Sequence, residues 1–475
     1  MNRSAPRTGA VTAPRLDSFL LLLCSVASLG GFLFGFDTAV ISGTIAMVVA
    51  QFHLSPFQEG FFASAALMGC VIGTAASGTL SDRIGRKPVL LLSAVLFVAS
   101  AAACAVPDAF ETLVVARIAS GIAVGVASVV APMYISEFAP ASSRGRFVAL
   151  YQLSIVIGVL LAYYSNWLLV RNAAQAAPGF VGWFGPRIMQ AEPWRAMFGA
   201  AIFPAFAFGA LLMAVPESPR WLWRKGRREQ AAAIAARLAN GGDILGGGLA
   251  EESPDSGSWR DLFRPGLRSA LFVAVMLSVF GQLSGVSIVV YYGPKILASA
   301  GFAKEAALLG QVGFGLINLV ATLVAMTIID RFGRRPLLIF GTAAVALTLF
   351  ATGAVFGSAG GGTPSATAAL WIGILICVYM AAVAISICSV IWVITAEIFP
   401  TSVRGRGTSL ATLANWTTNT LSALFFPVVV NAVGMAAGCY VIGAICVVAT
   451  WFYWKRVPET KGKTLEQIEQ MWVRK

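Results

Sequence analysis

Charged residues are scarce in this chain of 475 residues. Only 12% are Asp, Glu, Lys or Arg, and 58% are hydrophobic, whereas a soluble protein carries roughly 25% charged residues. Histidine occurs once, as His53, and the seven cysteines fall in apolar segments without metal-ligand spacing. We therefore expect an integral membrane protein with no metal site. The sequence contains no nucleophile–base pair and no nucleotide-binding loop, so we expect no enzyme.

Long apolar segments account for most of the sequence. Each candidate is long enough to cross a hydrocarbon core of about 30 Å. They predict an all-α membrane protein with twelve transmembrane helices, at residues 16–50, 57–80, 88–106, 110–136, 147–170, 194–214, 268–298, 305–329, 336–357, 367–396, 407–433 and 436–455.

The net charge of +13 is distributed unevenly among the connections. If the N-terminus is cytoplasmic, the even-numbered connections are cytoplasmic too, and they hold most Lys and Arg residues. The odd-numbered, outer connections hold only Arg171, Arg187, Arg195, Lys295 and Lys304. This bias predicts a multi-pass protein of the cell (plasma or inner) membrane with both termini in the cytoplasm. The basic excess therefore indicates a lipid bilayer as partner and no nucleic acid.

Three motifs occur twice, at similar separations. Asp82-Arg83-Ile84-Gly85-Arg86 recurs as Asp330-Arg331-Phe332-Gly333-Arg334. Glu137 followed by Arg144-Gly145-Arg146 recurs as Glu397 followed by Arg404-Gly405-Arg406. Pro216-Glu217-Ser218-Pro219-Arg220 has its counterpart in Pro458-Glu459-Thr460-Lys461-Gly462. The repeat predicts two pseudo-symmetric six-helix halves in parallel orientation.

The repeat also sets the expected domain boundaries. They are a cytoplasmic N-terminal tail (1–15), a first half (16–214), a cytoplasmic linker (215–267), a second half (268–455) and a cytoplasmic C-terminal tail (456–475). Within the linker, residues 224–240 are basic and alanine-rich and predict a short interfacial helix. Residues 241–258 are rich in Gly, Ser and acids, which is typical of a flexible linker.

Asp37 stands out because it lies in the middle of the first apolar segment. An ionisable group at that depth is costly and indicates a functional site. Arg117, in the fourth segment, is its natural partner, because an unpaired buried charge is the expensive case. Two interpretations stay open. The pair is either a static structural ion pair or a proton-coupling site at which Arg117 controls the protonation of Asp37.

With these motifs in order along nearly the whole chain, the sequence resembles the sugar porter family of the major facilitator superfamily, bacterial sugar/proton symporters in particular. The resemblance rests on Gly35-Phe36-Asp37-Thr38 and on the repeated motifs above. It implies the major facilitator fold, with twelve helices around a central cavity, and alternating access. It also implies import of a monosaccharide or related polyol by proton symport, with no cofactor beyond the proton gradient.

The resemblance also implies a substrate site. The residues at matching positions are Gln152, Gln282, Ser287, Tyr292, Asn318, Trp392 and Asn415, and we expect Phe32 of the first segment to form a wall of the site. The sequence departs from the family pattern before Trp392, where Cys388-Ser389 replaces Gly-Pro, and at two positions of the seventh segment. Gly281 stands where the family has a first glutamine, and Ser287 where it has an asparagine. Because both departures shorten side chains, we expect room for a differently substituted ligand and do not infer which sugar is bound.

The charged motifs predict a gate at the cytoplasmic mouth. Arginine forks can pair with carboxylates and bridge helix ends. We expect such pairs to hold the mouth shut in the outward-facing state. The candidate residues are Asp82, Arg83, Arg86, Glu137, Arg144, Glu217, Arg220, Asp330, Arg331, Arg334, Glu397, Arg404 and Glu459. The alternative is that these charges only determine topology.

Two other functions fit the same fold. A passive sugar uniporter would not need Asp37, and a non-transporting nutrient sensor would be expected to carry longer tails. Export of amphipathic drugs is disfavoured by the amides expected in the cavity. The expected partners are a small sugar or polyol, a proton and the bilayer, with the protein acting as a monomer.

Overall fold

The computed structural model describes residues 18–140, 144–175, 191–238, 259–359, 362, 364–400, 403–461 and 467, with the backbone only at 144, 145, 174, 175, 259, 330 and 396. The predicted tail 1–15, the flexible linker 241–258 and most of the tail 456–475 lie outside these ranges. The same holds for the side chains of Arg144 and Asp330.

The first half contains six predicted spans. They are α1 (Ser18–Phe52), α2 (Pro56–Ile84), α3 (Arg86–Ala105), α4 (Phe110–Phe138), α5 (Arg144–Gln175), and α7 (Pro193–Gly199) continued by α8 (Ile202–Ala214). In the linker, α9 (Pro219–Arg224) and α10 (Arg228–Ala235) are separated at Gly226, whose φ is +78°. Within the range 224–240 predicted as an interfacial helix, α10 begins only after Gly226, because a positive φ interrupts a right-handed helix.

The second half begins after the short 3₁₀ helix η2 (Trp259–Phe263). It contains α12 (Leu267–Leu283) with α13 (Val286–Ser299), α14 (Lys304–Phe332), α15 (Arg334–Ser358), α16 (Ala366–Val383) with the π-helical η3 (Ala384–Cys388) and α17 (Ser389–Glu397), and α18 (Arg404–Arg456). The last two predicted spans are one assigned helix with a non-helical residue, Gly434, between them. Glycine tolerates the φ of +82° that makes this bend.

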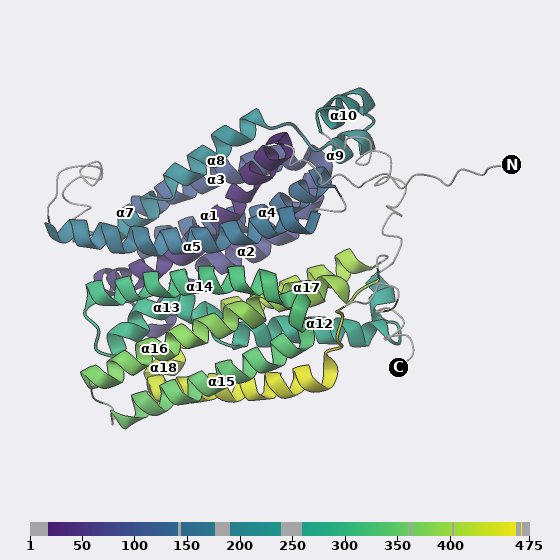
Figure 1. The fold of residues 1–475 in the computed structure, drawn as a ribbon. Helices are drawn as coiled ribbons and strands as arrows, with labels where there is room; N and C mark the ends of the chain where they lie inside the picture. Colours follow the sequence, from purple (N-terminus) through teal and green to yellow (C-terminus); the bar gives the residue numbers. More distant parts are fainter. Residues whose placement is uncertain are drawn as a thin grey trace.

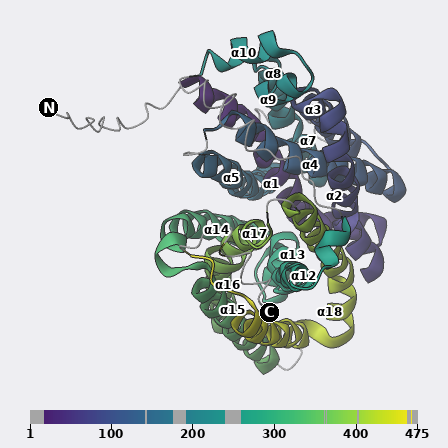
Figure 2. The same ribbon diagram turned by 90° about the vertical axis from the view of Figure 1, so that its right-hand side faces the viewer.

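The two halves lie one above the other, as Figures 1 and 2 show. Within the first half α1 packs on α5 and α2 on α4, and within the second α15 and α12 pack on α18. Within the described ranges the halves meet mainly where α2 packs on α18, α5 on α14 and α1 on α13. Eleven helices of the described ranges are long and apolar enough to cross a membrane, α18 holding two predicted spans.

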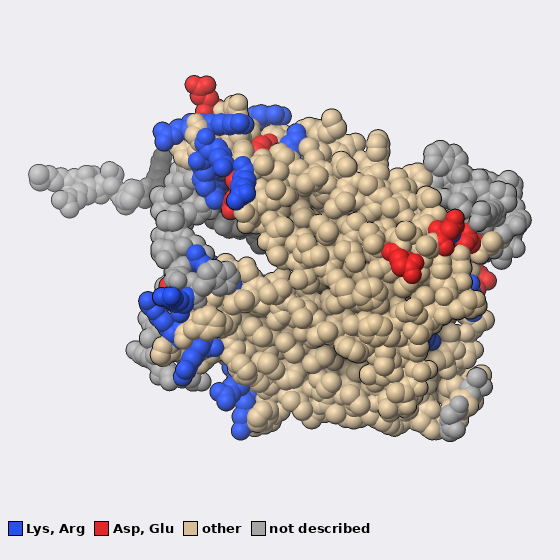
Figure 3. Space-filling view, turned by 180° about the vertical axis from the view of Figure 1, so that it is seen from behind, with Lys and Arg blue, Asp and Glu red and all other residues tan. Residues whose placement is uncertain are grey.

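The outer surface of the bundle is apolar. Large side chains such as Phe340, Leu347 and Phe206 expose 75%, 70% and 69% of their area. In water such a surface would be unfavourable, whereas it matches the hydrocarbon tails of lipid. Figure 3 shows this tan belt between two charged ends, one of them rich in Lys and Arg. We call this the basic end, where Arg86, Arg224 and Arg334 lie, and we call the other the opposite end.

A notch separates the two halves at the basic end (Figure 3). At the opposite end the halves are in contact. A Cβ atom at Gly60 of α2 would lie 1.9 Å from the carbonyl oxygen of Leu424 in α18, so the two backbones touch there. The Tyr163 hydroxyl of α5 also donates to the carbonyl of Val290 in α13, at 3.1 Å. The bundle is therefore open between its halves at the basic end and closed at the other.

Candidate functional site

Asp37 and Arg117 form a buried ion pair, as the sequence predicted. Nη1 of Arg117 donates to Oδ1 of Asp37 at 2.9 Å, and Nη2 of Arg117 donates to the main-chain carbonyl of Asp37 at 3.3 Å. Ser120 donates to the same carboxylate, at 2.9–3.0 Å from its two oxygens. Asp37 is 7% exposed, and Arg117 and Ser120 are each 1% exposed. The carboxylate is thus held by one charged and one neutral donor in a site shielded from water.

Ser120 was missed by the sequence analysis. It lies three residues after Arg117 on α4, and i,i+3 residues share one face of a helix. Its Oγ also lies 3.3 Å from Nη1 of Arg117. This spacing is the signal that could have identified Ser120.

Close helix packing brings these side chains together. A Cβ atom at Gly35 would lie 1.9 Å from the Ile155 carbonyl oxygen of α5, and one at Gly121 would lie 1.9 Å from that of Ala66 in α2. Only glycine permits such backbone contact between membrane helices. The two glycines flank Asp37 and Arg117 in sequence, so they set how closely α1, α4 and their neighbours approach around the ion pair.

A small cavity adjoins the ion pair. It measures about 10 Å³ and is lined by Asp37, Arg117 and Cys70 of the first half and by Tyr291 of the second. This is room for about one water molecule. The ring of Phe198 lies 5.1 Å from Cζ of Arg117 and covers the guanidinium. The Asp37 site therefore borders the interface between the halves.

A cluster of amides and hydroxyls lies in the second half. Ser287 Oγ donates to Oε1 of Gln282 at 2.7 Å, and Nε2 of Gln282 donates to Oδ1 of Asn415 at 3.2 Å. Gln282 and Ser287 flank the break between α12 and α13, where Gly285 has a φ of +91°. The two side chains meet across this break, and Gln282 reaches α18. Three of the predicted substrate residues are thus brought together.

A second contact extends this cluster towards Asp37. The amide of Asn419, one helical turn after Asn415, lies 3.4 Å from the Tyr291 hydroxyl. Tyr291 is 3% exposed and lines the cavity around Asp37. The amide cluster and the ion pair are therefore neighbours of the same tyrosine, which lies on α13.

The other predicted substrate residues are more dispersed. Phe32, Gln152 and Asn318 are half-buried, on α1, α5 and α14 respectively, and Trp392 on α17 is 42% exposed. Tyr292 is fully buried, and its hydroxyl donates to the Ala423 carbonyl at 2.9 Å. In this conformation Tyr292 joins α13 to α18.

The space at Gly281 is already filled. A Cβ atom there would lie 2.6 Å from Cδ1 of Ile391 on α17. The expectation that the missing glutamine leaves room for ligand is therefore not met at this position, because a neighbouring aliphatic side chain occupies it. The neighbour of Gly281 at this point is therefore apolar.

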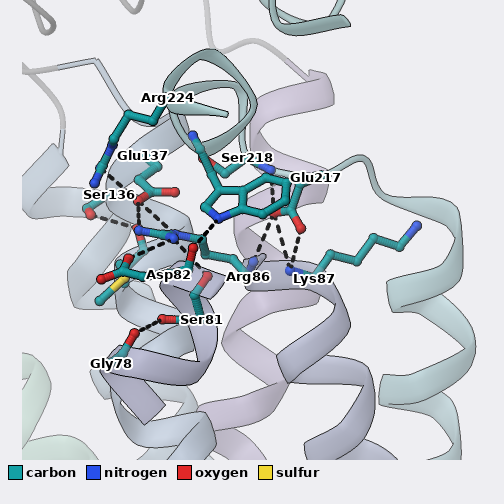
Figure 4. A network of polar contacts seen from close by, with 12 residues as sticks. Gly78, Ser81, Asp82, Arg86, Lys87, Ser136, Glu137, Glu217, Ser218 and Arg224 are labelled. Atoms are coloured by element: carbon teal, nitrogen blue, oxygen red, sulfur yellow. Dashed lines mark hydrogen bonds and ion pairs between the residues drawn. The ribbon is translucent and has the colours of Figure 1, made fainter. Parts of the chain in front are cut away.

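Charged side chains at the basic end form a network in the first half (Figure 4). Arg86, 2% exposed, lies 3.0 Å from Glu137 and 3.1 Å from Asp82. Arg224 of α9 approaches the same Glu137 at 3.7 Å. The network ties the ends of α2, α3 and α4 to the linker helix α9.

Glu217 and Glu459 bind main-chain N–H groups at helix N-termini, a role that the sequence did not predict. Glu217 accepts main-chain N–H groups of Arg86 and Lys87, at the start of α3 (Figure 4). Glu459 accepts those of Arg334 and Arg335, at the start of α15. We expected arginine side chains as partners. The carboxylates instead cap helix N-termini, where the helix dipole favours negative charge.

Burial raises the pKa of Glu217 above its ordinary value of 4.5, and the main-chain N–H groups and Glu137 act on it less strongly. The N–H groups oppose the rise because they bind the ionised carboxylate, whereas Glu137 adds to it through like charge.

The second half repeats this arrangement in part. Arg334 lies 3.6 Å from Glu397, and this pair corresponds to Arg86–Glu137 of the first half, which is 3.0 Å apart. Arg404 is half-buried and donates to the Phe399 carbonyl. Arg220 is buried, and Arg83 and Arg331 are exposed at the ends of α2 and α14. The pairs Arg86–Glu137 and Arg334–Glu397 each join two residues of the same half.

Comparisons with known proteins agree with this architecture. The family described as "Sugar (and other) transporter" matches residues 23–472. The arabinose-proton symporter of Bacillus subtilis (strain 168) is 33% identical over 98% of this chain and 97% of its own. The D-xylose-proton symporter of Escherichia coli (strain K12) is 36% identical over 96% of each chain.

A solved structure matches the fold. The xylose transporter XylE from E. coli, in an inward-open conformation, superposes with a TM-score of 0.79 at 34% identity, covering 95% of this chain and 100% of that one. These matches confirm the predicted family and the all-α fold. The chain belongs to the sugar transporter family, and it is therefore a membrane transporter of the major facilitator fold and not an enzyme.

Proposed function

We propose that this chain imports a monosaccharide or a related polyol together with a proton, by alternating access. The observation that carries the proposal is the buried Asp37–Arg117–Ser120 cluster beside Tyr291, which also contacts the amide cluster through Asn419. The family and the two relatives named as sugar-proton symporters support the same function. The proton gradient supplies the driving force, and no cofactor is required.

Asp37 carries the coupled proton in this proposal. With the ion pair formed, the carboxylate is ionised and α1 is tied to α4. Uptake of a proton neutralises Asp37, which removes the attraction to Arg117 and one hydrogen-bond acceptor for Ser120. The α1–α4 contact is thereby loosened. Because Tyr291 of the second half lines the same cavity, such a change acts directly on the interface that must move.

The sugar is bound between the halves by the amide cluster. Gln282, Ser287 and Asn415 supply donors and acceptors that suit hydroxyl groups, while Gln152 and Asn318 contribute from α5 and α14. The ring of Trp392 and that of Phe32 provide apolar faces for the sugar ring. Ile391, which fills the space beside Gly281, makes one wall of this site apolar. This wall favours a ligand with a hydrogen or methylene group at that point.

The basic end faces the cytoplasm in this proposal, as the positive-inside bias indicates. The notch there is then the inward opening, in line with the likeness to inward-open XylE. The predicted gate takes a revised form. Arg86–Glu137 and Arg334–Glu397 hold helix ends together within each half. The mouth closes when the two charged networks approach each other.

The test is uptake into proteoliposomes with and without an inward proton gradient. L-arabinose, D-xylose, D-glucose and xylitol serve as substrates. The wild type should accumulate at least one of them above equilibrium when the outside is acidic. Asp37→Asn should lose accumulation and retain binding in a thermal-shift assay. Glu111→Gln, which removes an exposed carboxylate at the start of α4, should behave as wild type.

Two results would contradict the proposal. Uptake that never exceeds equilibration under the gradient would identify a passive uniporter or a carrier coupled to another ion, with Asp37–Arg117 as a structural pair. Binding without any uptake would identify a nutrient sensor.

A further inference from the structure

An ion pair between Glu59 and Lys295 joins the two halves at the opposite end. Nζ of Lys295 lies 2.5 and 2.7 Å from the two carboxylate oxygens of Glu59. Glu59 is in the first turn of α2 in the first half, and Lys295 is near the end of α13 in the second. The side chain of Glu59 is 6% exposed and that of Lys295 is 42% exposed. A carboxylate buried to this degree depends on its partner.

The pair borders a cavity between the halves. This cavity has a volume of about 410 Å³ and is lined by residues of α1, α2, α13 and α14, including both members of the pair, Ser42 and Tyr291. Tyr291 also lines the small cavity around Asp37. Separation of Glu59 from Lys295 would therefore open a route from the opposite end to the tyrosine that neighbours the ion pair.

The pair lies where the halves must part. Gly60 follows Glu59 in the chain, and its position against the Leu424 carbonyl brings the backbones of α2 and α18 into contact. Opening this end moves α2 away from the second half, so Glu59 and Lys295 must separate and each must be hydrated. The ion pairs described at the basic end join residues within one half, and the same movement leaves them intact.

We propose that Glu59 and Lys295 form a latch that stabilises the conformation closed at the opposite end, and that its release is a step of outward opening. The proposal rests on alternating access between two halves. It is independent of which sugar is transported and of the role of Asp37.

The experiment measures access to the cavity from the outer side. Ser42, 5% exposed and part of the cavity wall, is replaced by cysteine as a reporter. An impermeant maleimide is then applied to oriented proteoliposomes. The labelling rate of protein without the Ser42→Cys substitution is subtracted, because the chain has seven native cysteines. Neither sugar nor a proton gradient is present, so failure of the proposed function does not alter the readout.

Breaking the latch should accelerate labelling. Glu59→Gln and Lys295→Met should each raise the rate roughly three- to tenfold, the population shift expected from the loss of one ion pair. Glu305→Gln, which removes an exposed carboxylate in the first turn of α14 at the same end, should leave it unchanged. Glu59→Lys combined with Lys295→Glu should return the rate towards that of wild type.

An unchanged labelling rate would contradict the proposed latch. If the single variants label at the wild-type rate and only their melting temperatures fall, the pair is structural and the latch does not exist. If Glu59→Gln fails to fold, the labelling rates of Lys295→Met and of the conservative variant Glu59→Asp test the proposal instead. Glu59→Asp keeps the charge but shortens the side chain, and an unchanged labelling rate in both variants would overturn the proposal.

Discussion

Asp37 is a carboxylate whose hydrogen bonds come from Arg117 and Ser120 on one helix face. A hydrogen bond to an ionised group contributes about 1.5–3 kcal/mol. Ser120→Ala should therefore lower the apparent melting temperature in detergent, because one donor to a buried carboxylate is lost. Ser128→Ala is the matched control, since Ser128 on the same helix donates only to the Gly125 carbonyl of its own helix.

The Ser120 effect should depend on the charge of Asp37. In an Asp37→Asn background the acceptor is neutral, so Ser120→Ala should cost less than it does in the wild type. A double-mutant cycle measures this difference directly. Equal costs in both backgrounds would show that Ser120 acts through packing and not through the carboxylate.

Glu217 gives a prediction of pH dependence. Burial raises the pKa of this carboxyl above 4.5, so the folded state binds its proton more tightly than the unfolded state does. The stabilisation is present in full below pH 4.5 and is lost as the pH rises through the raised pKa. The melting temperature of the wild type, relative to that of Glu217→Gln, should therefore fall from pH 4.5 towards neutrality. A constant difference across this range would contradict the assignment.

At the level of helices, the break between α12 and α13 positions the amide cluster. Gly285 has a φ of +91°, and the Tyr379 hydroxyl donates to the freed carbonyl of Ser284 at 2.9 Å. Gly285→Ala should cost about 1–2 kcal/mol from the left-handed backbone. Its Cβ would also meet the Tyr379 hydroxyl at 3.3 Å. Sugar binding, measured by thermal shift, should weaken as Gln282 and Ser287 move.

Gly226, between α9 and α10, supplies the control for this prediction. Its φ is +78°, and a Cβ there would meet no atom within 4 Å. Gly226→Ala should introduce similar backbone strain far from the amide cluster and leave sugar binding unchanged. Weakened binding in both variants would indicate a general loss of stability.

The sequence predicted the helices better than their side-chain partners. Apolar length was sufficient to predict the spans, the last two of which form one assigned helix bent at Gly434, and charge burial was sufficient to pair Asp37 with Arg117. By contrast, the space beside Gly281 could not be assessed, because Ile391 reaches it from a helix more than a hundred residues away. The capping roles of Glu217 and Glu459 were also missed. Their partners are main-chain N–H groups, which do not depend on which side chains the partner residues carry.

For the molecule as a whole, the internal repeat has a structural counterpart. Glu217 caps α3 and Glu459 caps α15, each beside a glycine of positive φ, Gly85 and Gly333. The same contacts thus occur once in each half. Because they are internal to a half, each half can move as a unit while its capped helix ends stay intact.

Lys and Arg side chains lie on both sides of the notch at the basic end (Figure 3). We call these two groups of positive charge the rims, and the repulsion between them depends on ionic strength. Salt screens charges over about 10 Å at 0.1 M and over longer distances when dilute. Dilute buffer should hold the rims apart, and added salt should let them approach. Spin labels at Ile84→Cys and Phe332→Cys, equivalent exposed positions of the two halves, should therefore report shorter distances as salt rises. Equal distances in dilute and concentrated salt would show that the rims do not repel. A change in distance would mean that the ionic composition of the cytoplasm helps to determine the lifetime of the conformation open on that side.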